Sequence, residues 1–301
     1  ASYKNSIMKK IFYLIIALNF LLGSCSKTEP FLKVGLVADP QYANQPTSGK
    51  RHYRESLRKL EEAIDTFNYY KIDLIQNLGD VIDVKWESYD AILPIYDKLN
   101  PDIENYHLLG NHEFAIDSTR FKDILERLSM PDYYYSYSEK GWRFIVLDAT
   151  DYAYYSNSLH DHDIREIDLY FENTKDQPNS NNWNSAIGKK QQNWLKQELE
   201  NADLLDQKVI LFSHMPLRPK NDPHNLWNDN EIINIIEQST KVVAFINGHN
   251  HSGDYEFKNR IHYITIFGMV DTMISSFGIL EFYKDSLVLK GYGNQKNIII
   301  K

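Results

Sequence analysis

Five short polar motifs, each directly after an apolar run with the length and composition of a β-strand, constrain the fold of this chain most strongly. The apolar runs cover residues 34–38, 74–78, 106–109, 209–212 and 242–246. The motifs that follow them are Asp39-Pro40-Gln41, Gly79-Asp80, Gly110-Asn111-His112-Glu113, His214 and Gly248-His249-Asn250-His251. Loops at the carboxyl ends of the strands of an open α/β sheet meet in one crevice. The pattern therefore predicts one site to which both halves of the chain contribute.

The polar side chains of these motifs are of the kinds that bind divalent cations. Carboxylate oxygen, amide oxygen and imidazole nitrogen suit ions such as Mn²⁺. The chain offers these donors in Asp39, Gln41, Asp80, Asn111, His214, His249 and His251. The carboxylate of Asp80 is placed to bridge two neighbouring cations, and such a pair of cations indicates hydrolysis of phosphate esters or a closely related reaction.

Each of these residues has a commoner structural role when it is taken alone. An aspartate after a strand often caps a helix, and a lone histidine such as His214 is more often a hydrogen-bonded core residue. The ordered set of five motifs favours a metal centre over five separate structural roles. We expect Gly79, Gly110 and Gly248 to permit the sharp turns that expose the side chains after them.

The remaining pattern alternates strands with helices and then changes to strands alone. Apolar residues spaced three and four apart, together with helix stop signals, predict the helices. The predicted helices cover residues 52–69, 87–99, 119–128, 189–200 and 230–238. Paired strands are predicted at 133–137 and 143–147, and strands with turns follow from residue 255 onward. This order predicts a single α/β domain with two sheets between helical layers, in which the polar residues 151–184 form a long substrate-contacting loop.

Longer segments around these motifs resemble a known family. They are Asp39-Pro40-Gln41-Tyr42, Arg51-His52-Tyr53-Arg54-Glu55-Ser56-Leu57, Leu78-Gly79-Asp80-Val81-Ile82-Asp83, Gly110-Asn111-His112-Glu113-Phe114, Trp142-Arg143-Phe144-Ile145-Val146-Leu147-Asp148-Ala149, Gln192-Asn193-Trp194-Leu195, Ser213-His214-Met215-Pro216 and Lys290-Gly291-Tyr292-Gly293. The chain resembles the calcineurin-like metallophosphoesterase superfamily, and within it the manganese-dependent ADP-ribose/CDP-alcohol diphosphatases. That superfamily usually has histidine where Gln41 stands, whereas the diphosphatase subgroup has glutamine, so this difference favours the narrower resemblance.

The resemblance implies a four-layer α/β/β/α sandwich of two mixed β-sheets flanked by helices. It also implies two divalent cations, with manganese expected and with iron or zinc as alternatives. The implied ligands of the first cation are Asp39, Gln41, Asp80 and His251, and those of the second are Asp80, Asn111, His214 and His249. The implied reaction splits the diphosphate bond of nucleoside-diphosphate-linked alcohols or sugars into a nucleoside monophosphate and a phospho-alcohol.

Four further residues are candidates for contacts with the substrate. His112 adjoins Asn111 and is predicted to protonate the leaving group as a general acid; the alternative is that it orients the phosphate. Tyr42 and Trp227 are candidates for stacking on a base or sugar, although core packing is the commoner role of such side chains. Arg54 is a candidate phosphate ligand, although an early helix position is more often a solvated one.

The first residues have the features of an export signal. Lys9 and Lys10 precede an apolar stretch at 11–22, and Leu22-Gly23-Ser24-Cys25 resembles a bacterial lipobox. We expect a signal peptide at 1–24, with residues 1–7 upstream of the true start, a lipid-anchored tether at 25–32 and the catalytic domain at 33–301. The alternative is an ordinary signal peptide with an unmodified cysteine. The expected location is the bacterial cell envelope, on its periplasmic or cell-surface side.

Charge and cysteine content exclude several classes of function. The formal net charge is −8, and loss of Lys4, Lys9 and Lys10 with the leader would make it −11, which argues against nucleic-acid binding. The single cysteine, Cys25, leaves no internal disulfide and no thiol nucleophile. We expect a monomer acting on a small phosphate-containing substrate. The alternatives are a broader phosphomonoesterase or phosphodiesterase acting on envelope or extracellular esters, and a non-catalytic binding lipoprotein.

Overall fold

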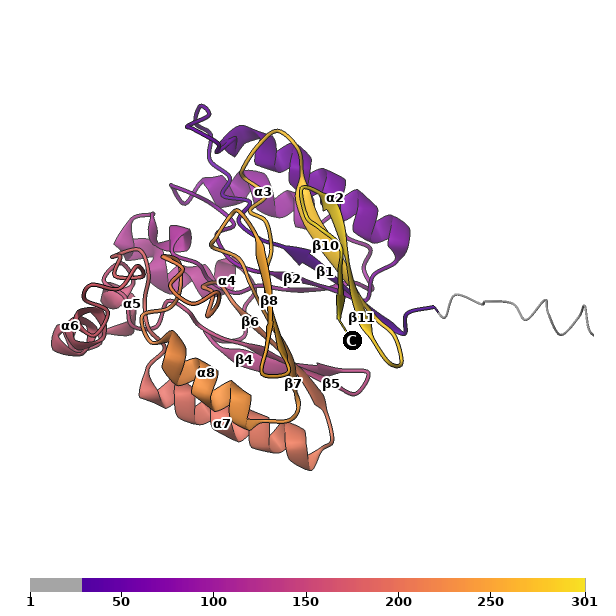
Figure 1. Cartoon of the computed structure of the whole chain (residues 1–301). Coiled ribbons are helices and arrows are strands. Elements are labelled where there is room, and N and C mark those ends of the chain that lie inside the picture. The colour runs from indigo at the N-terminus through magenta and orange to yellow at the C-terminus, as the bar shows by residue number, and fades with distance from the viewer. Residues whose placement is uncertain (1–28, 301) are drawn as a thin grey trace, which may run out of the picture. The chain divides into compact units, whose positions relative to one another are not determined.

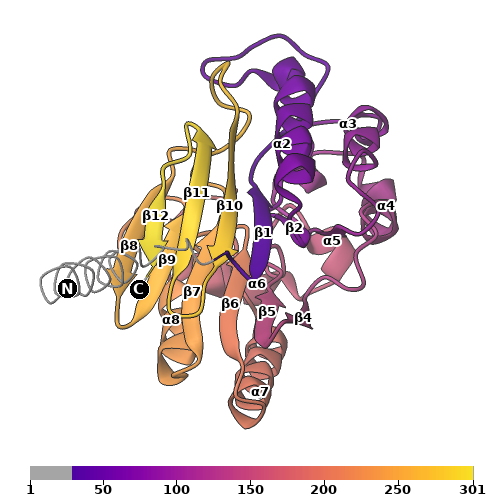
Figure 2. The same ribbon diagram turned by 90° about the vertical axis from the view of Figure 1, so that its right-hand side faces the viewer.

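Two mixed β-sheets of six strands each pack face to face, and helices cover their outer faces (Figures 1 and 2). The computed structural model describes residues 29–300, and Phe31–Lys301 form one compact unit. The predicted four-layer sandwich is confirmed. The predicted signal peptide and Cys25 lie outside the described residues, among which no helix is long and apolar enough to cross a bilayer.

The first sheet brings the N-terminal strands against the last strands of the chain, in the order β12-β11-β10-β1-β2-β3. Its strands are β1 (Leu32–Val37), β2 (Leu74–Asn77), β3 (Glu104–Tyr106), β10 (Ser276–Phe282), β11 (Leu287–Gly293) and β12 (Ile298–Ile300). β1, β2 and β3 run parallel, so the motifs after them lie at the same edge of the sheet. β10 to β12 add antiparallel strands. β3 ends earlier than predicted, and residues 107–110 lead on to Asn111 without regular structure.

The second sheet has the order β4-β5-β6-β7-β9-β8. Its strands are β4 (Tyr135–Glu139), β5 (Trp142–Val146), β6 (Lys208–Ser213), β7 (Val242–Asn247), β8 (Asp254–Lys258) and β9 (Ile261–Thr265). The predicted antiparallel pair is β4 with β5, and β5, β6, β7 and β9 are parallel. β6 and β7 therefore deliver the two histidine motifs at one edge.

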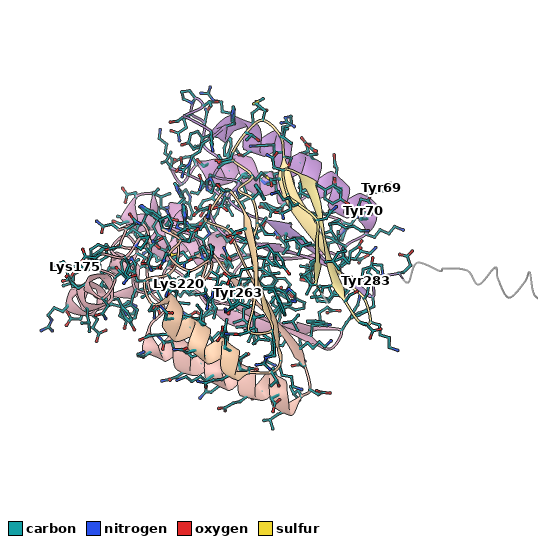
Figure 3. All side chains as sticks on the ribbon, in the orientation of Figure 1. Tyr69, Tyr70, Lys175, Lys220, Tyr263 and Tyr283 are labelled. Carbon is teal, nitrogen blue, oxygen red and sulfur yellow. The ribbon has the colours of Figure 1, made fainter. Side chains whose placement is uncertain are left out.

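Helices α2 (Ser56–Tyr70) and α3 (Ser88–Tyr96) cover the first sheet, and α7 (Lys189–Leu204) and α8 (Asp229–Gln238) cover the second (Figure 1). α2 follows a 3₁₀ turn, η1 (Tyr53–Glu55), and ends before Lys71, whose φ of 50° is left-handed. Tyr69 at this end is 79% exposed (Figure 3). The helix predicted over 119–128 is a 3₁₀ segment, η3 (Ser118–Asp123), that continues as α4 (Ile124–Arg127).

The alternation of side chains along the strands builds two apolar layers. Phe144 on β5 packs between the sheets against Phe212 and Phe282, with ring centroids 5.9 and 6.0 Å away. The next residue, Ile145, faces the opposite way and joins the apolar cluster under α7 and α8. At Gly35 on β1 a Cβ atom would lie 2.7 Å from Ile72 Cδ1 and 3.0 Å from Phe67 Cζ, so glycine here leaves room for Phe67 of α2 to pack against the strand.

Residues 151–184 are not a structureless loop as predicted. They contain α5 (Asn157–His160) and α6 (Ile164–Glu172). Asp163 caps α6 by accepting a hydrogen bond from the Arg165 amide. α6 buries only Ile167 completely, and its apolar residues Ile164 and Leu169 are exposed. We call residues 151–184 the insertion.

Candidate metal centre

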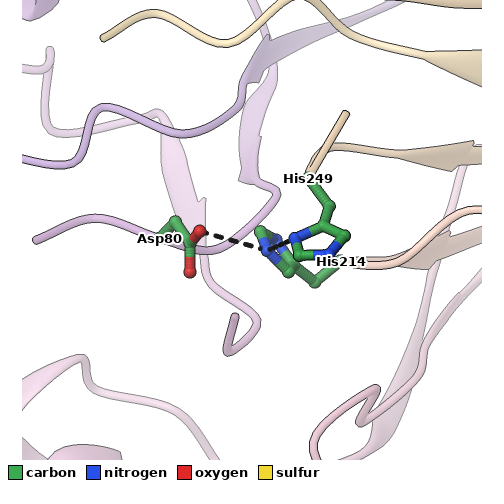
Figure 4. A group of neighbouring side chains, drawn as sticks. All are labelled: Asp80, His214 and His249. Carbon is green, nitrogen blue, oxygen red and sulfur yellow. Dashed lines mark hydrogen bonds and ion pairs between the residues drawn. The ribbon is translucent and has the colours of Figure 1, made fainter. Parts of the chain in front are cut away.

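The predicted cation ligands converge at the edge where the two sheets meet, although 212 positions separate the first from the last in sequence (39 to 251). They lie in the loops after β1, β2, β3, β6 and β7. Figure 4 shows three of them, Asp80, His214 and His249, whose donor atoms all lie within 4.8 Å of one another. The structure thus gathers donors that the sequence disperses, as expected for strands that end at one edge.

Asp80 lies at the middle of this cluster. Its Oδ2 is 3.2 Å from His214 Nε2 and accepts a 3.0 Å hydrogen bond from Gln41 Nε2. Its Oδ1 accepts a 2.8 Å hydrogen bond from the backbone amide of His112. The carboxylate therefore faces both halves of the predicted ligand set, which is the geometry that a bridging ligand needs.

The other donors surround this carboxylate. His249 Nδ1 lies 3.1 Å from His214 Nε2, and His251 Nε2 lies 3.5 Å from Asp39 Oδ1. His251 Nε2 is also 3.1 Å from Gln41 Nε2. Distances of 3–4 Å between donor atoms are those found around a bound cation, whose bonds to nitrogen and oxygen are about 2.0–2.2 Å long.

Each of the three histidines has its second ring nitrogen fixed by an acceptor. His214 Nδ1 lies 2.7 Å from Leu78 O, His249 Nε2 lies 3.1 Å from Asn184 Oδ1, and His251 Nδ1 lies 2.9 Å from Asp271 Oδ1. An N–H that donates to such an acceptor leaves the lone pair of the other nitrogen directed at the cluster, as is usual for metal-binding histidines. Sequence reasoning missed Asn184 and Asp271, because neither belongs to a metal-binding motif.

Two buried amide oxygens test whether this cluster fits cations. Within residues 29–300, the Oε1 atom of Gln41 and the Oδ1 atom of Asn111 are buried and have no hydrogen-bond partner. An unsatisfied buried acceptor costs about 1–3 kcal/mol, and a cation would satisfy both atoms. These are the two amide oxygens that the sequence predicts as ligands, so the residues present fit a pair of divalent cations.

The backbone at the site adopts an uncommon conformation. Asp39, Gln41, Asp80 and His249 have φ values of 52°, 44°, 54° and 68°. A left-handed backbone at residues other than glycine is uncommon and often marks a functional site. Of the three glycines predicted to permit sharp turns, Gly79 alone is left-handed, with a φ of 87°. At Gly248 a Cβ atom would lie 2.7 Å from Asp39 Oδ2, so this glycine serves close approach, and the other turns use the ligand residues themselves.

Gly110 and Glu113 hold the loops after β2 and β3 together. A Cβ atom on Gly110 would lie 2.2 Å from Asp80 Oδ1. Glycine is therefore required here because the two loops approach each other closely, and not because of a sharp turn, as the sequence predicted. The buried Glu113 carboxylate accepts hydrogen bonds from the amides of Asp80, Val81 and Gly110 at 2.9, 2.7 and 2.7 Å. Sequence reasoning assigned no role to Glu113, which positions the bridging residue.

Protons compete with cations for this site. Burial opposes a charge on His214, but Asp80 and Asp39 raise its pKa to about 9. Burial likewise opposes a charge on His251, but Asp39 and Asp271 raise its pKa to about 10. Burial and the neighbouring His214 lower the pKa of His249. Without a cation, His214 and His251 are therefore protonated at pH 7.

We predict that cation binding at pH 7 releases about two protons per chain, since both charged histidines must lose a proton before they can bind a metal. The apparent affinity should rise with pH by up to about tenfold per unit for each proton, until the pH passes the pKa of each histidine. Titration calorimetry with Mn²⁺ in buffers of different ionisation enthalpy measures the number released. A release near zero would show that His214 and His251 do not exchange a proton for a cation at this pH.

A pocket of about 750 Å³ opens directly above the cluster. His112, Lys50, Arg51, Trp183 and His224 line it together with the ligand residues. The Trp183 ring centroid lies 5.2 Å from that of His249 and 5.1 Å from that of His224. The insertion therefore does reach the pocket, through Trp183, and it also supports His249 through Asn184.

Among the residues that the structure describes, three of the substrate candidates, Tyr42, Trp227 and Arg54, do not line this pocket. Tyr42 is buried and pairs with Ile82 through the backbone. Trp227 is buried against Phe171 of the insertion, with ring centroids 5.2 Å apart. Arg54 donates to Asn44 at 2.9 Å on the surface. Tyr42 and Trp227 therefore have the alternative role of core packing, and Arg54 has the alternative role of a solvated surface residue.

His112 lies at the wall of the pocket, beside the cluster. Its Nε2 is 3.9 Å from Asp80 Oδ2, and its Nδ1 is hydrogen bonded to Asp83 Oδ1. Asp83 thereby fixes the ring with Nε2 toward the site. This geometry suits a proton donor to a group bound at the cations, and it adds Asp83 as a positioning residue that the sequence did not single out.

Comparison with known proteins agrees with this geometry. Residues 32–253 match the calcineurin-like phosphoesterase family. The manganese-dependent ADP-ribose/CDP-alcohol diphosphatase of Oryza sativa subsp. japonica is 31% identical, over 88% of this chain and 92% of the relative. The protein of the same name from Mus musculus is 28% identical over the same shares. The crystal structure of a dimetal phosphatase from Danio rerio aligns with a TM-score of 0.79 and 25% identity, covering 91% of this chain and 99% of that chain.

Proposed function

This chain belongs to the calcineurin-like phosphoesterase family of metal-dependent hydrolases, and we propose that it is a manganese-dependent diphosphatase. Its substrates would be nucleoside diphosphates linked to an alcohol or a sugar, of the ADP-ribose or CDP-alcohol type. The products would be a nucleoside monophosphate and a phospho-alcohol. The observation that carries the proposal is the match over 88% of the chain to relatives that bear this name, together with a cluster that retains every predicted ligand.

The pocket supports a nucleotide-sized substrate. Trp183 presents a flat aromatic side chain next to His249, where a base or ribose attached to a bound diphosphate would stack. Lys50 and Arg51 line the same pocket and supply positive charge for the second phosphate. A phosphomonoester of a small aliphatic alcohol would use the cluster but would leave this aromatic side unoccupied.

The described residues would have different roles in hydrolysis. Asp39, Gln41, Asp80, Asn111, His214, His249 and His251 would hold two divalent cations, which supply charge neutralisation of the phosphoryl oxygens and activation of water when bound. His112, oriented by Asp83, would donate its Nε2 proton to the leaving phosphate oxygen. Trp183 and the insertion would orient the nucleoside and limit access of bulk water.

The test compares substrates under manganese loading. We expect kcat/KM for CDP-choline and ADP-ribose to exceed that for p-nitrophenyl phosphate by about 100-fold or more, equivalent to about 2.7 kcal/mol of transition-state binding to the nucleoside. Comparable values on all three would indicate a broad phosphomonoesterase instead. A protein that binds two manganese ions but hydrolyses none of the three substrates would be a binding protein.

We also propose that the mature protein is a monomer anchored in the bacterial cell envelope through a lipid on Cys25. The support is the sequence Leu22-Gly23-Ser24-Cys25 after a basic and apolar leader. Incorporation of a labelled fatty acid should be lost in Cys25→Ser, and incorporation that persists would rule out this anchor.

A further inference from the structure

A second cluster of metal-binding side chains lies at the base of the insertion and shares no residue with the candidate metal centre. Asp151, His160 and His162 each offer one donor atom, and the three donor atoms lie within 4.8 Å of one another. Asp148 adds a second carboxylate, with its Oδ2 3.6 Å from His160 Nε2.

The donor atoms of this cluster lie near enough to one another to surround a tetrahedral zinc ion. With metal–ligand bonds of about 2.0–2.1 Å, neighbouring donors in a tetrahedron are about 3.3 Å apart. His160 Nε2 lies 3.6 Å from Asp148 Oδ2, close to this value. His162 Nε2 and Asp151 Oδ1 are hydrogen bonded at 2.8 Å, and binding of an ion would replace this hydrogen bond with two bonds to the metal. The two imidazole rings are stacked, with centroids 5.6 Å apart and an interplanar angle of 9°.

His160 provides an independent observation. Its side chain is only 10% exposed, and within the described part of the chain its Nε2 is buried without a hydrogen-bond partner. The 3.6 Å separation from Asp148 is too long for a hydrogen bond. A buried ring nitrogen that faces a carboxylate without bonding to it is explained if a cation lies between them.

The charges around the cluster also favour a cation. In residues 29–300 neither Asp148 nor Asp151 forms an ion pair with a lysine or arginine. The Asp148 side chain is 2% exposed, and burial raises its pKa, with the charge of Asp151 adding to the effect and His160 opposing it. Their ion-pair partners are His160 and His162, and two close carboxylates are costly unless protons on these histidines or a metal neutralise them.

We propose that Asp148, Asp151, His160 and His162 bind a third metal ion, a zinc ion with a structural role. Two imidazoles and two carboxylates in this arrangement suit Zn²⁺. Asp148 and Asp151 follow β5, whereas His160 ends α5 and His162 precedes α6. The ion would therefore fasten the insertion to the second sheet.

This zinc ion would act on the pocket through the insertion. Asp151 Oδ2 also accepts a 2.9 Å hydrogen bond from the amide of Gly188, at the start of α7. Trp183, which lines the pocket, and Asn184, which supports His249, lie between these anchored points. Loss of the ion should loosen this segment first and leave the two sheets intact.

The experiment removes the candidate metal centre first, so that a third ion can be counted alone. The full chain carrying Asp80→Ala is stripped with a chelator, incubated with Zn²⁺ alone, freed of unbound metal and analysed by mass spectrometry of the metal. We expect about one zinc per chain in Asp80→Ala and none in Asp80→Ala/His162→Ala. The matched control is Asp80→Ala/Asp161→Asn, because Asp161 is exposed and lies between the two histidines, and it should retain its zinc.

Thermal stability and proteolysis give a second test, which does not depend on a variant that folds poorly. Zinc should raise the melting temperature of Asp80→Ala by on the order of 5 °C and slow proteolysis within 151–184, and both effects should be absent in Asp80→Ala/Asp151→Asn. Zinc that fails to bind Asp80→Ala, or that binds equally after His162→Ala and Asp151→Asn, would overturn the proposal.

Discussion

Replacing Asp80 with alanine is expected to abolish cation binding at both positions of the candidate metal centre and catalysis together. The side chain is 1% exposed and lies between His214 Nε2 and Gln41 Nε2, within 3.2 Å of each. Both cations would lose a negatively charged ligand, whereas the neighbouring Asp39 carboxylate lies farther from His214 Nε2, at 4.0 Å. We expect manganese content to fall from two ions to fewer than one and kcat/KM to fall by about 10⁴-fold or more.

The loss of kcat/KM in Asp80→Ala should be larger than a general effect of the substitution on folding would cause. Asp80 Oδ1 accepts a hydrogen bond from the His112 amide, so alanine additionally frees the loop that carries Asn111 and His112. Asp90→Ala is the control: its side chain is 65% exposed and pairs with Arg127 on the surface, an interaction worth about 0–1 kcal/mol. Metal analysis, circular dichroism and steady-state kinetics on both variants separate the two causes. Turnover by Asp80→Ala with one manganese still bound would refute the bridging role.

The ligands could be predicted from sequence because strand order converts chain order into proximity. Asp39, Asp80, His214 and His249 each follow a strand whose apolar run is unmistakable, and parallel neighbours end at one edge. Nothing more than the type of residue and its place after a strand was needed. The same reasoning could not supply the left-handed φ of Asp39 and Asp80, because only the packed turns impose it.

The supporting residues could not be predicted, because their role arises from tertiary contacts. Asp271 contacts His251 from 20 positions away, and Asn184 contacts His249 from 65 positions away. Neither residue belongs to a rare motif. Trp183 and Trp227 look alike in the sequence, since both lie in polar surroundings. The fold places Trp183 in the pocket and buries Trp227 under the insertion, and no local pattern distinguishes these outcomes.

The role of His112 leads to the second large effect. We predict that His112→Ala lowers kcat by about 10²–10⁴-fold on substrates whose leaving group needs a proton, and by less than about tenfold on substrates whose leaving group departs as a stable anion. The reason is position: His112 lines the pocket beside Asp80 and is held by Asp83. Burial opposes its charge, but Asp80 and Asp83 raise its pKa above the ordinary value, so the ring is a proton donor near neutral pH.

The measurement is kcat for aryl esters of cytidine monophosphate that differ only in the acidity of the phenol. Dinitrophenyl and phenyl esters are the two extremes of this series. For the phenyl ester, activity of the unaltered protein should fall as the pH rises through the pKa of His112, because the acid form is then lost. Asp83→Asn should reproduce part of the defect, since it leaves the ring in place but weakens its orientation and its charge. An equal loss on both esters would mean that His112 orients the phosphate and does not donate the proton. In that case the leaving group must receive its proton from solvent, and the pH profile of the phenyl ester should be the same with and without His112.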